Sequence, residues 1–329
     1  MIGPFAGWRR SLYGAGVFRS ESLPRPVISV GNLSVGGSGK TPHVQFLASW
    51  LTELGMKVAV LSRGYGRRSK GVVWVSRGDG PAVSAEIGGD EPVLLAILLP
   101  GVPVLVGESR AEAGRECLRC REVDAFLLDD GFQHLSLRRD ADLLLVEAEG
   151  GLGNRRTLPL GPLREPAESA RFADALVVTK CADAAQGEKS ASAVPFPSDR
   201  PRAFSRLVAR ATVDRHGVES PLSGGGEEVV AFSGLARNGQ FLETLRASGY
   251  AVRKFFPFGD HHRYRPAELK EIASAAGGAP VLTTEKDLVR ISGPLPFNLK
   301  ALRIGVEFLS GWEDLSRLIL ETLGTAGKR

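Results

Sequence analysis

The amino-acid sequence predicts an α/β protein: a P-loop NTPase-like parallel sheet flanked by helices, with a second, smaller α/β domain joined by a two-stranded hinge. Three observations predict this fold. Short apolar runs alternate with helical stretches over the first 180 residues, a glycine-rich turn ending in Lys-Thr links the first run to a helix, and a further strand–helix series begins after residue 202. Continuous Val/Leu runs separated by helices are typical of parallel strands covered on both faces.

The elements of the first domain follow from this alternation. Strands are expected at Pro26–Val30, Val58–Leu61, Val102–Val106, Ala125–Leu128, Asp142–Val146 and Ala175–Val178, and helices at His43–Leu54, Glu91–Leu98 and Arg110–Glu122. From Cys181 to Arg202 the composition changes to Ala, Ser, Pro and charged residues, which indicates a surface excursion.

The second domain begins with the alternating stretch RAFSRLVARATV, which indicates an extended strand from about Arg202. Later elements are expected at Glu228–Phe232, Gln240–Ser248, Ala251–Phe255, Pro266–Ala276 and Val281–Thr283, followed by a returning strand in LKALRIGVEFL and a closing helix at Gly311–Leu323. We expect residues 204–212 and 300–308 to pair as a stem. The smaller lid domain would then be 206–307, and the P-loop domain 1–205, completed by 308–329.

The charge of the chain favours an acidic partner. Net charge is +5, and 32 of the 42 basic residues are Arg, the side chain best suited to bidentate phosphate contact. A phosphorylated substrate, an anionic membrane face or nucleic acid would fit, although a GC-rich genome alone explains an Arg excess equally well. Nucleic acid is disfavoured because the basic residues are scattered without an aromatic platform. No obligate protein partner is evident.

The three cysteines do not form a disulfide framework. Cys117 and Cys120 make a C-x-x-C within a helical stretch, and only Cys181 remains to complete a four-ligand zinc site. A metal or redox role for them is therefore disfavoured, and a reducing compartment is expected.

The first 20 residues have an amphipathic pattern. The apolar residues Ile2, Phe5, Trp8 and Leu12 would share one helical face, which Arg residues flank. Such a helix suits a membrane interface, and the alternative is a helix packed on its own domain. No apolar run is long enough to span a bilayer.

The stretch SVGGSGKT, residues 34–41, predicts a phosphate-binding loop. Its glycines, Gly36, Gly37 and Gly39, permit close backbone approach, so that N–H groups can surround a phosphate together with Ser34 and Ser38. Lys40 would reach the β/γ oxygens of a nucleotide, and Thr41 would ligate Mg²⁺. Ser34 stands where the usual pattern has its first glycine.

Acidic and histidine side chains at the ends of elements are further candidates. Asp129 and Asp130 follow a buried strand in DAFLLDDGFQH, where a metal and a phosphate-rich ligand would explain adjacent acids. Asp90 precedes an apolar helix and suits either an N-cap or a positioned base. His261 and His262 lie in a loop, either as surface residues or as groups that orient a base or bind phosphate.

Basic loops complete the set of candidates. LSRGYGRRSKG carries Arg63, Arg67 and Arg68, GESR ends in Arg110, and RTLPLGPLREP contains Arg156, Arg164 and Glu165. Such clusters suit phosphate binding, but a single Arg is more often plain surface.

The ordered set GNLSVGGSGKTP, SRGYGRR, GDEP, DDGFQH, LPLGPLREP, DHHRY and TTEKD resembles tetraacyldisaccharide 4′-kinase, the lipid A kinase of Gram-negative bacteria. The resemblance extends from about Leu12 to Leu309, and DDGFQH and GPLREP are its specific motifs. Ser34 also fits, since this family tolerates Ser or Thr at that position.

The resemblance implies an activity. ATP would donate its γ-phosphate to the 4′-hydroxyl of a tetraacylated glucosamine disaccharide 1-phosphate, a lipid A precursor. Lys40 and Thr41 would hold ATP and Mg²⁺, while the second domain closes over ATP through the two-stranded hinge. The enzyme would work peripherally at the cytoplasmic face of the bacterial inner membrane.

The resemblance also implies roles for particular side chains. Asp129 and Asp130 would serve the metal, with Glu165 a further metal ligand. The resemblance makes Asp90 the base, oriented by His261. Arg110 and Gln133 match family positions that lie near the phosphates or the substrate.

One departure from the family and two alternatives stay open. Family members usually begin with a hydrophobic, often membrane-spanning helix, so either the start of this chain is misassigned or it binds its membrane peripherally. A P-loop kinase or ATPase for a soluble metabolite is the first alternative. A GTP-dependent metallochaperone-type switch is the second, although VVTKCAD has Thr179 for Asn and one residue too many before Asp183 to match N-K-x-D.

Overall fold

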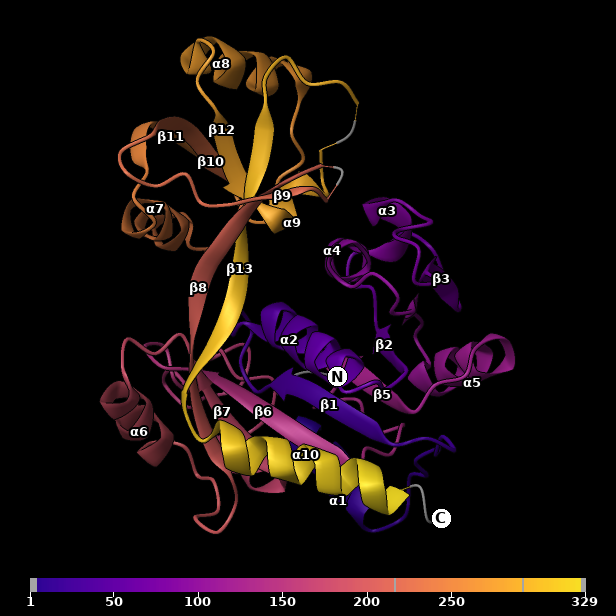
Figure 1. The fold of residues 1–329 in the computed structure, drawn as a ribbon. Coiled ribbons are helices and arrows are strands. Elements are labelled where there is room, and N and C mark those ends of the chain that lie inside the picture. Colours follow the sequence, from indigo (N-terminus) through magenta and orange to yellow (C-terminus); the bar gives the residue numbers. More distant parts are fainter. Residues whose placement is uncertain (1–4, 216, 292, 327–329) are drawn as a thin grey trace.

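A computed structural model describes residues 5–215, 217–291 and 293–326. Its dominant feature is one continuous sheet that runs through both parts of the molecule, in the order β11-β10-β12-β13-β8-β7-β6-β1-β5-β2-β4-β3, with β9 attached to β8. Figure 1 shows the two long strands β8 and β13 connecting the lower part to the upper part. Helices flank the sheet, so the predicted mixed α/β fold is confirmed.

The lower part contains the mostly parallel sheet. Its strands are β1 (Val27–Asn32), β2 (Val58–Ser62), β3 (Val73–Ser76), β4 (Val104–Val106), β5 (Ala125–Asp129), β6 (Ala141–Glu147) and β7 (Ala175–Thr179). β1 lies between β5 and β6 and is parallel to both. The edge strand β3, which the sequence pattern did not predict, is antiparallel to β4. The parallel arrangement places the carboxyl ends of β1 and β5 side by side, where the P-loop and the Asp-Asp pair follow.

Helices cover both faces of this sheet. Side chains alternate between the two faces along each strand, and in strands such as β1, β2 and β5 both sets are buried. The helices are α1 (Phe5–Gly14), α2 (Lys40–Glu53), α3 (Ala85–Gly88), α4 (Asp90–Leu98), α5 (Arg110–Cys120), the 3₁₀ helix η1 (Ala167–Phe172), α6 (Ala184–Ser192) and α10 (Trp312–Ala326). α2, α4 and α10 share one apolar core with residues such as Ile28 and Leu127, whereas α5 packs on the opposite face against Val27 and Phe126.

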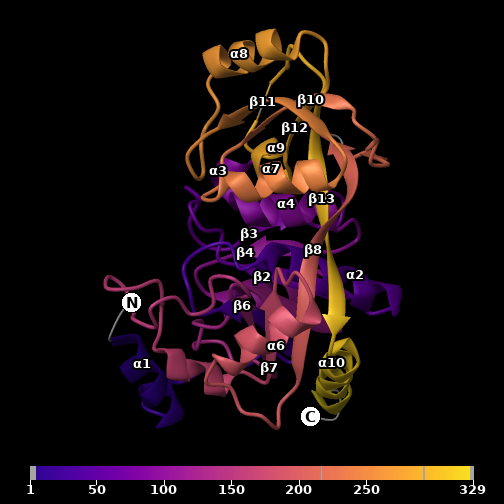
Figure 2. The same ribbon diagram turned by 90° about the vertical axis from the view of Figure 1, so that its left-hand side faces the viewer.

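The upper part is a smaller α/β unit. It holds β9 (Glu219–Ser220), β10 (Glu228–Ser233), β11 (Ala251–Pro257), β12 (Val281–Thr284), α7 (Asn238–Ala247), α8 (Pro266–Ala276) and α9 (Glu285–Leu288). α7 and α8 belong to separate apolar clusters around Leu245 and Ile272, and Figure 2 shows this unit at the end of the long strands, near α3 and α4.

The predicted stem is present. β8 (Arg202–Asp214) and β13 (Leu299–Ser310) pair antiparallel from Phe204 opposite Ser310 to Asp214 opposite Lys300. The register shifts between Arg303 and Ile304, which marks an irregularity in the middle of the stem. The domain boundaries at 205/206 and 307/308 stay a prediction. We call residues 206–307 the lid and the rest the core region.

The segment from Cys181 to Arg202, expected as a surface excursion, contains a helix that the sequence pattern did not predict. Residues 184–192 form helix α6, and the Asp183 side chain caps it by accepting a hydrogen bond from the Gln186 backbone N–H at 2.8 Å. The Asp at the N-cap and the following Ala residues favour a helix, but the short segment has few apolar residues to reveal its periodicity.

Candidate active site

The glycine-rich loop follows β1 and ends where α2 begins. Gly36 and Gly39 have φ angles of 118° and 79°, in the left-handed region that glycine tolerates. A Cβ added at Gly36 or Gly37 would meet no atom within 4 Å, so the loop faces open space. Thr179 at the end of β7 donates to the Ser38 carbonyl at 2.9 Å and thereby fixes the loop to the sheet. The backbone here is suited to surround an anion.

His43 braces the loop from behind. Its Nδ1 lies 2.8 Å from the Gly39 carbonyl, and its Nε2 lies 2.9 Å from Ser205 Oγ on β8. Burial lowers the pKa of His43 to about 4, so the ring is neutral at physiological pH. The first turn of α2 is thus tied to the foot of the stem that carries the lid.

Lys40 lies at the centre of a buried polar cluster. Its Nζ donates to Asn32 Oδ1 at 3.2 Å and is 3.5 Å from Asp130 Oδ1. Asp130 has a positive φ of 53° and accepts from Arg164 Nη1 at 2.7 Å. Burial alone would raise the pKa of Asp130, but Lys40 and Arg164 outweigh it and hold that pKa below its usual range. The loop lysine and the Asp-Asp turn therefore meet, as the sequence pattern predicts.

Asp129 is buried and short of partners. Its Oδ2 accepts from Ser62 Oγ at 3.1 Å, while Oδ1 has no hydrogen-bond partner among the described residues. Burial, with the nearby charges of Glu91 and Asp130, raises the pKa of Asp129 to about 7. A buried carboxylate oxygen of this kind fits a divalent cation, which supplies the missing positive charge. Asp129 is therefore a suitable residue to hold a cation, while the roles of Asp130 and Thr41 as further Mg²⁺ ligands stay a prediction.

Other unsatisfied polar atoms gather at the same place. Ser38 Oγ, Asn32 Nδ2 and Arg110 Nε are buried without hydrogen-bond partners in the described part of the chain. Burial, aided by the charge of Arg63, lowers the pKa of Arg110 to about 10, yet the guanidinium stays charged at neutral pH. Since buried polar groups are normally satisfied, this concentration indicates a site that takes a polar, anionic ligand.

The lid contributes a second group of residues, above the start of α4. His261 Nδ1 lies 3.1 Å from Asp90 Oδ2, so the two residues proposed to act together are in contact. Arg290, which the sequence analysis did not single out, donates from Nε to the same Asp90 oxygen at 2.7 Å. Beside this group, Lys286 in α9 donates to Glu91 at 2.5 Å. Their motifs GDEP and TTEKD were noticed as patterns, but only the fold brings Glu91 and Lys286 together.

The ion pairs between lid and core region have a consistent polarity in the described residues. The core acids Glu86, Asp90, Glu91 and Glu147 pair with the lid bases Arg263, His261, Arg290, Lys286 and Arg237. Core acids at α3, at the start of α4 and at the end of β6 thus hold basic side chains of the lid against the core region.

Two predicted residues have other partners. Both oxygens of Glu165 accept from Arg10, at 2.9 and 3.3 Å, and this ion pair is buried. The role of Glu165 as a metal ligand stays a prediction, and in this structure its carboxylate is paired with Arg10. Gln133 donates to the Asn32 carbonyl at 2.9 Å and accepts from Arg164 at 3.3 Å, beside the cluster.

Helix α1 docks on the core region through its arginines. Arg10 is buried against the Phe132 and Phe172 rings, while Trp8 is 73% exposed. Of the predicted apolar face, Ile2 lies outside the described residues, as does the side chain of Phe5. The helix is therefore packed on its own domain yet leaves a large aromatic side chain in solvent. No helix in the described residues is long and apolar enough to cross a membrane.

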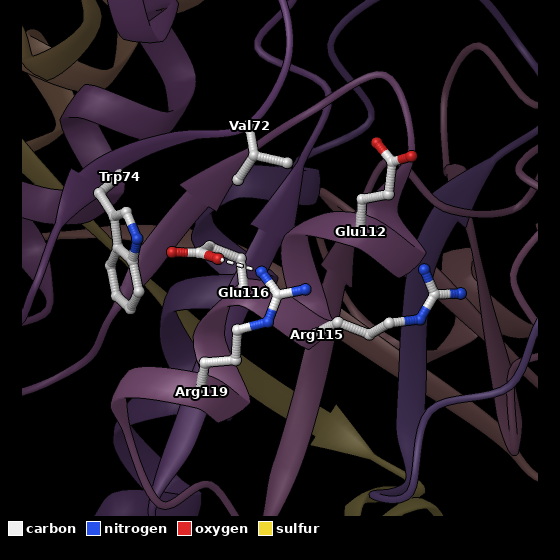
Figure 3. A pocket seen from close by; sticks show the side chains of 6 residues that line it. All are labelled: Val72, Trp74, Glu112, Arg115, Glu116 and Arg119. Atoms are coloured by element: carbon white, nitrogen blue, oxygen red, sulfur yellow. Dashed lines mark hydrogen bonds and ion pairs between the residues drawn. The ribbon is translucent and has the colours of Figure 1, made fainter.

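A separate surface pocket lies between β3 and α5. Figure 3 shows its lining residues, Val72, Trp74, Glu112, Arg115, Glu116 and Arg119. Arg119 donates a hydrogen bond to Glu116 at 2.8 Å, and Arg115 forms an ion pair with Glu21. None of the predicted site residues lines this pocket.

Comparison with known proteins identifies the family. Residues 1–324 match the sequence profile described as LpxK, tetraacyldisaccharide-1-P 4′-kinase. A tetraacyldisaccharide 4′-kinase of Anaeromyxobacter sp. is 40% identical over 98% of this chain and 88% of its own length. Its counterpart in Aquifex aeolicus is 40% identical over 95% and 93%.

A solved structure agrees with the sequence comparisons. The "apo" form of LpxK from Aquifex aeolicus, crystallised in complex with ATP, superimposes with a TM-score of 0.80 at 39% identity, over 97% of this chain and 95% of that one. The chain belongs to the tetraacyldisaccharide-1-P 4′-kinase family.

Proposed function

We propose that this protein transfers the γ-phosphate of ATP to the 4′-hydroxyl of tetraacyldisaccharide 1-phosphate, in lipid A biosynthesis. The observation that carries the proposal is the placement of Lys40 and the Asp129–Asp130 turn beneath a lid that brings His261 to Asp90. In this proposal the donor site and the acceptor site would be adjacent. Family membership over nearly the whole chain supports the choice of acceptor.

On the donor side, the loop from Ser34 to Thr41 would surround the phosphates with its backbone N–H groups. Lys40 would exchange its contacts with Asn32 and Asp130 for the β/γ oxygens of ATP. Mg²⁺, held by Thr41, Asp129 and Asp130, would supply positive charge beside those oxygens. Arg110 would complete the neutralisation from the N-terminus of α5.

On the acceptor side, Asp90 would accept the proton of the 4′-hydroxyl, and His261 would help to orient its carboxylate. Phosphoryl transfer has a loose transition state, so placing the hydroxyl in line matters at least as much as removing its proton. The lid therefore contributes by position as well as by charge.

A peripheral membrane location is part of the proposal. Trp8 is exposed, and the next residue, Arg9, stacks over the Tyr13 ring at 5.2 Å. Trp residues with Arg neighbours favour an anionic interface. We place the protein at the cytoplasmic face of the bacterial inner membrane, where its acylated substrate would be presented.

The proposal is tested by incubating purified protein with ATP, Mg²⁺ and the disaccharide 1-phosphate lipid, and measuring the lipid by mass spectrometry. The expected product is heavier by one phosphate group. An unchanged lipid, with a soluble sugar or metabolite phosphorylated instead, would favour the alternative of a metabolite kinase. GTP preference would favour the switch-type alternative, although Thr179 is already bonded to the P-loop and Asp183 caps α6.

A further inference from the structure

We infer that Arg290 is the principal positioning residue for Asp90, an inference that rests on the proposed role of Asp90 as the acceptor base. Arg290 lies just after α9 in the lid, and its side chain is only 5% exposed. Its Nε donates to Asp90 Oδ2 at 2.7 Å, which is the shortest contact that Asp90 makes in the described residues. The lid therefore reaches the base through a buried guanidinium.

The guanidinium is itself held in place by the lid. Its Nη1 donates to Asp287 Oδ1 and to the Gly234 carbonyl, both at 3.1 Å. Asp287 is fully buried, and its other oxygen accepts from Thr284 Oγ1 at 2.6 Å and from the Gly234 N–H at 3.1 Å. A rotation of Arg290 would break several bonds at once, so the Nε–H direction is fixed before substrate binds.

His261 is less constrained than Arg290. Its side chain is 51% exposed, and its Nδ1 lies 3.1 Å from both Asp90 Oδ2 and Arg290 Nη2. A guanidinium has only donors, so Nδ1 can donate to Asp90 or accept from Arg290, but not both. The contact between Arg290 and Asp90 depends on no such choice, because Arg stays protonated. Arg290 is the constant partner of Asp90, and His261 the variable one.

Arg290 Nε and His261 Nδ1 both lie against the same oxygen of Asp90. Since Arg290 and His261 lie against Oδ2, the second oxygen, Oδ1, is the one that the structure assigns to the acceptor hydroxyl. The hydroxyl proton would pass to Oδ1 while the sugar oxygen bonds to the γ-phosphorus and the bond to ADP breaks. Lid closure would thus aim Oδ1, in addition to excluding water.

The experiment compares Arg290→Gln and Arg290→Lys with Arg263→Gln, a matched control. Arg263 is another lid Arg that contacts a core carboxylate, Glu86 at 3.0 Å, but that pair is exposed. We expect Arg290→Gln to lower kcat about 100-fold, within the range for general-base assistance, with KM for lipid and Kd for ATP nearly unchanged. The kcat of Arg290→Lys should lie between those of Arg290→Gln and the original protein, because Lys keeps the positive charge but lacks the planar fork of Arg. Arg263→Gln should keep the original kcat.

Two further readouts separate positioning from a purely structural role. Methylguanidine should partly restore kcat to Arg290→Ala and leave the low kcat of Asp90→Asn unchanged. Arg290→Gln/Asp90→Asn should be little slower than Asp90→Asn alone, since residues acting as one unit are not additive. Losses that multiply in the double variant, or an Arg290→Gln enzyme with the original kcat, would overturn the inference.

A measurement without lipid keeps the inference distinct from the proposed function. Crystal structures should show the Asp90 carboxylate turned away in Arg290→Gln but retained in His261→Gln. An Asp90 that stays in place without Arg290 would refute the inference even if the lipid is phosphorylated. Failure of the original protein to phosphorylate lipid would refute the proposed function, while the Asp90 orientation would still decide whether Arg290 positions it.

Discussion

Asp129→Asn should make the protein more stable when no metal is bound. It should also abolish the kinase activity measured with ATP and Mg²⁺. Asp129 is buried beside Asp130 and Glu91, and one of its oxygens has no partner in the described residues. The native residue therefore carries an electrostatic cost that is useful only when a cation binds. Asn has nearly the same shape and removes the charge.

The magnitude follows from the raised pKa of Asp129. A rise from the ordinary 3.8 to about 7 corresponds to at most about 4 kcal/mol, at about 1.4 kcal/mol per unit of pKa. Because the Asn amide also needs buried partners, we expect a net gain of about 1–3 kcal/mol. Above pH 3.8 the unfolded chain loses this proton before the folded one does, so the penalty grows as the pH rises towards 7 and is fully present above it.

The assay is urea unfolding in metal-free buffer at pH 5 and pH 8. The free energy of unfolding of Asp129→Asn should exceed that of the original protein at pH 8, and the difference should shrink at pH 5. Millimolar Mg²⁺ with ATP should stabilise the original protein far more than the variant, because ligands that bind the folded state shift unfolding. A variant that is less stable than the original at pH 8 without metal would refute the reasoning.

Three other predictions concern the loop, the acceptor site and α1. Lys40→Ala should lower kcat far more than it raises KM for lipid, because Lys40 acts on the transferring phosphate; near-normal turnover would mean that the loop is not the ATP site. Asp90→Ala should lose roughly 10²–10⁴-fold in kcat with ATP binding intact, and Asp90→Ala/His261→Ala should be little worse; multiplied losses would separate the two residues. Trp8→Ala should weaken cosedimentation with anionic vesicles while the unfolding midpoint stays unchanged; unchanged sedimentation would place the membrane contact elsewhere. Arg10→Ala should instead cost about 3–5 kcal/mol of stability, because it leaves Glu165 buried without its partner.

The sequence predicted most of the sheet because the buried strands are continuous apolar runs. The strands around Val27, Val58 and Ala125 were expected within a few residues of their observed bounds. The stem was also predictable, since alternation in RAFSRLVARATV indicated one long strand and LKALRIGVEFL a returning strand that could pair with it. α6 was missed because it has few large apolar residues, and β3 because a strand of four residues gives little periodicity to detect.

Some contacts of the candidate site could be predicted from the sequence, and others could not. Lys40, Asp129 and Asp130 could be brought together from sequence because P-loop and acidic turn both follow parallel strands. The contacts of Arg290 and Glu91 could not, because they depend on how the lid meets the start of α4, some 200 residues away in the chain. Local patterns predict elements and loops, but pairings between distant segments depend on packing.

The most direct test of the account follows the γ-phosphate itself. ATP whose γ-phosphate carries heavy oxygen is incubated with Mg²⁺, the disaccharide 1-phosphate lipid and the purified protein, and the product is fragmented in a mass spectrometer. The account predicts one labelled phosphate on the distal sugar at its 4′ position, absent with Lys40→Ala. Label released only as free phosphate, or found on a soluble acceptor, would contradict it.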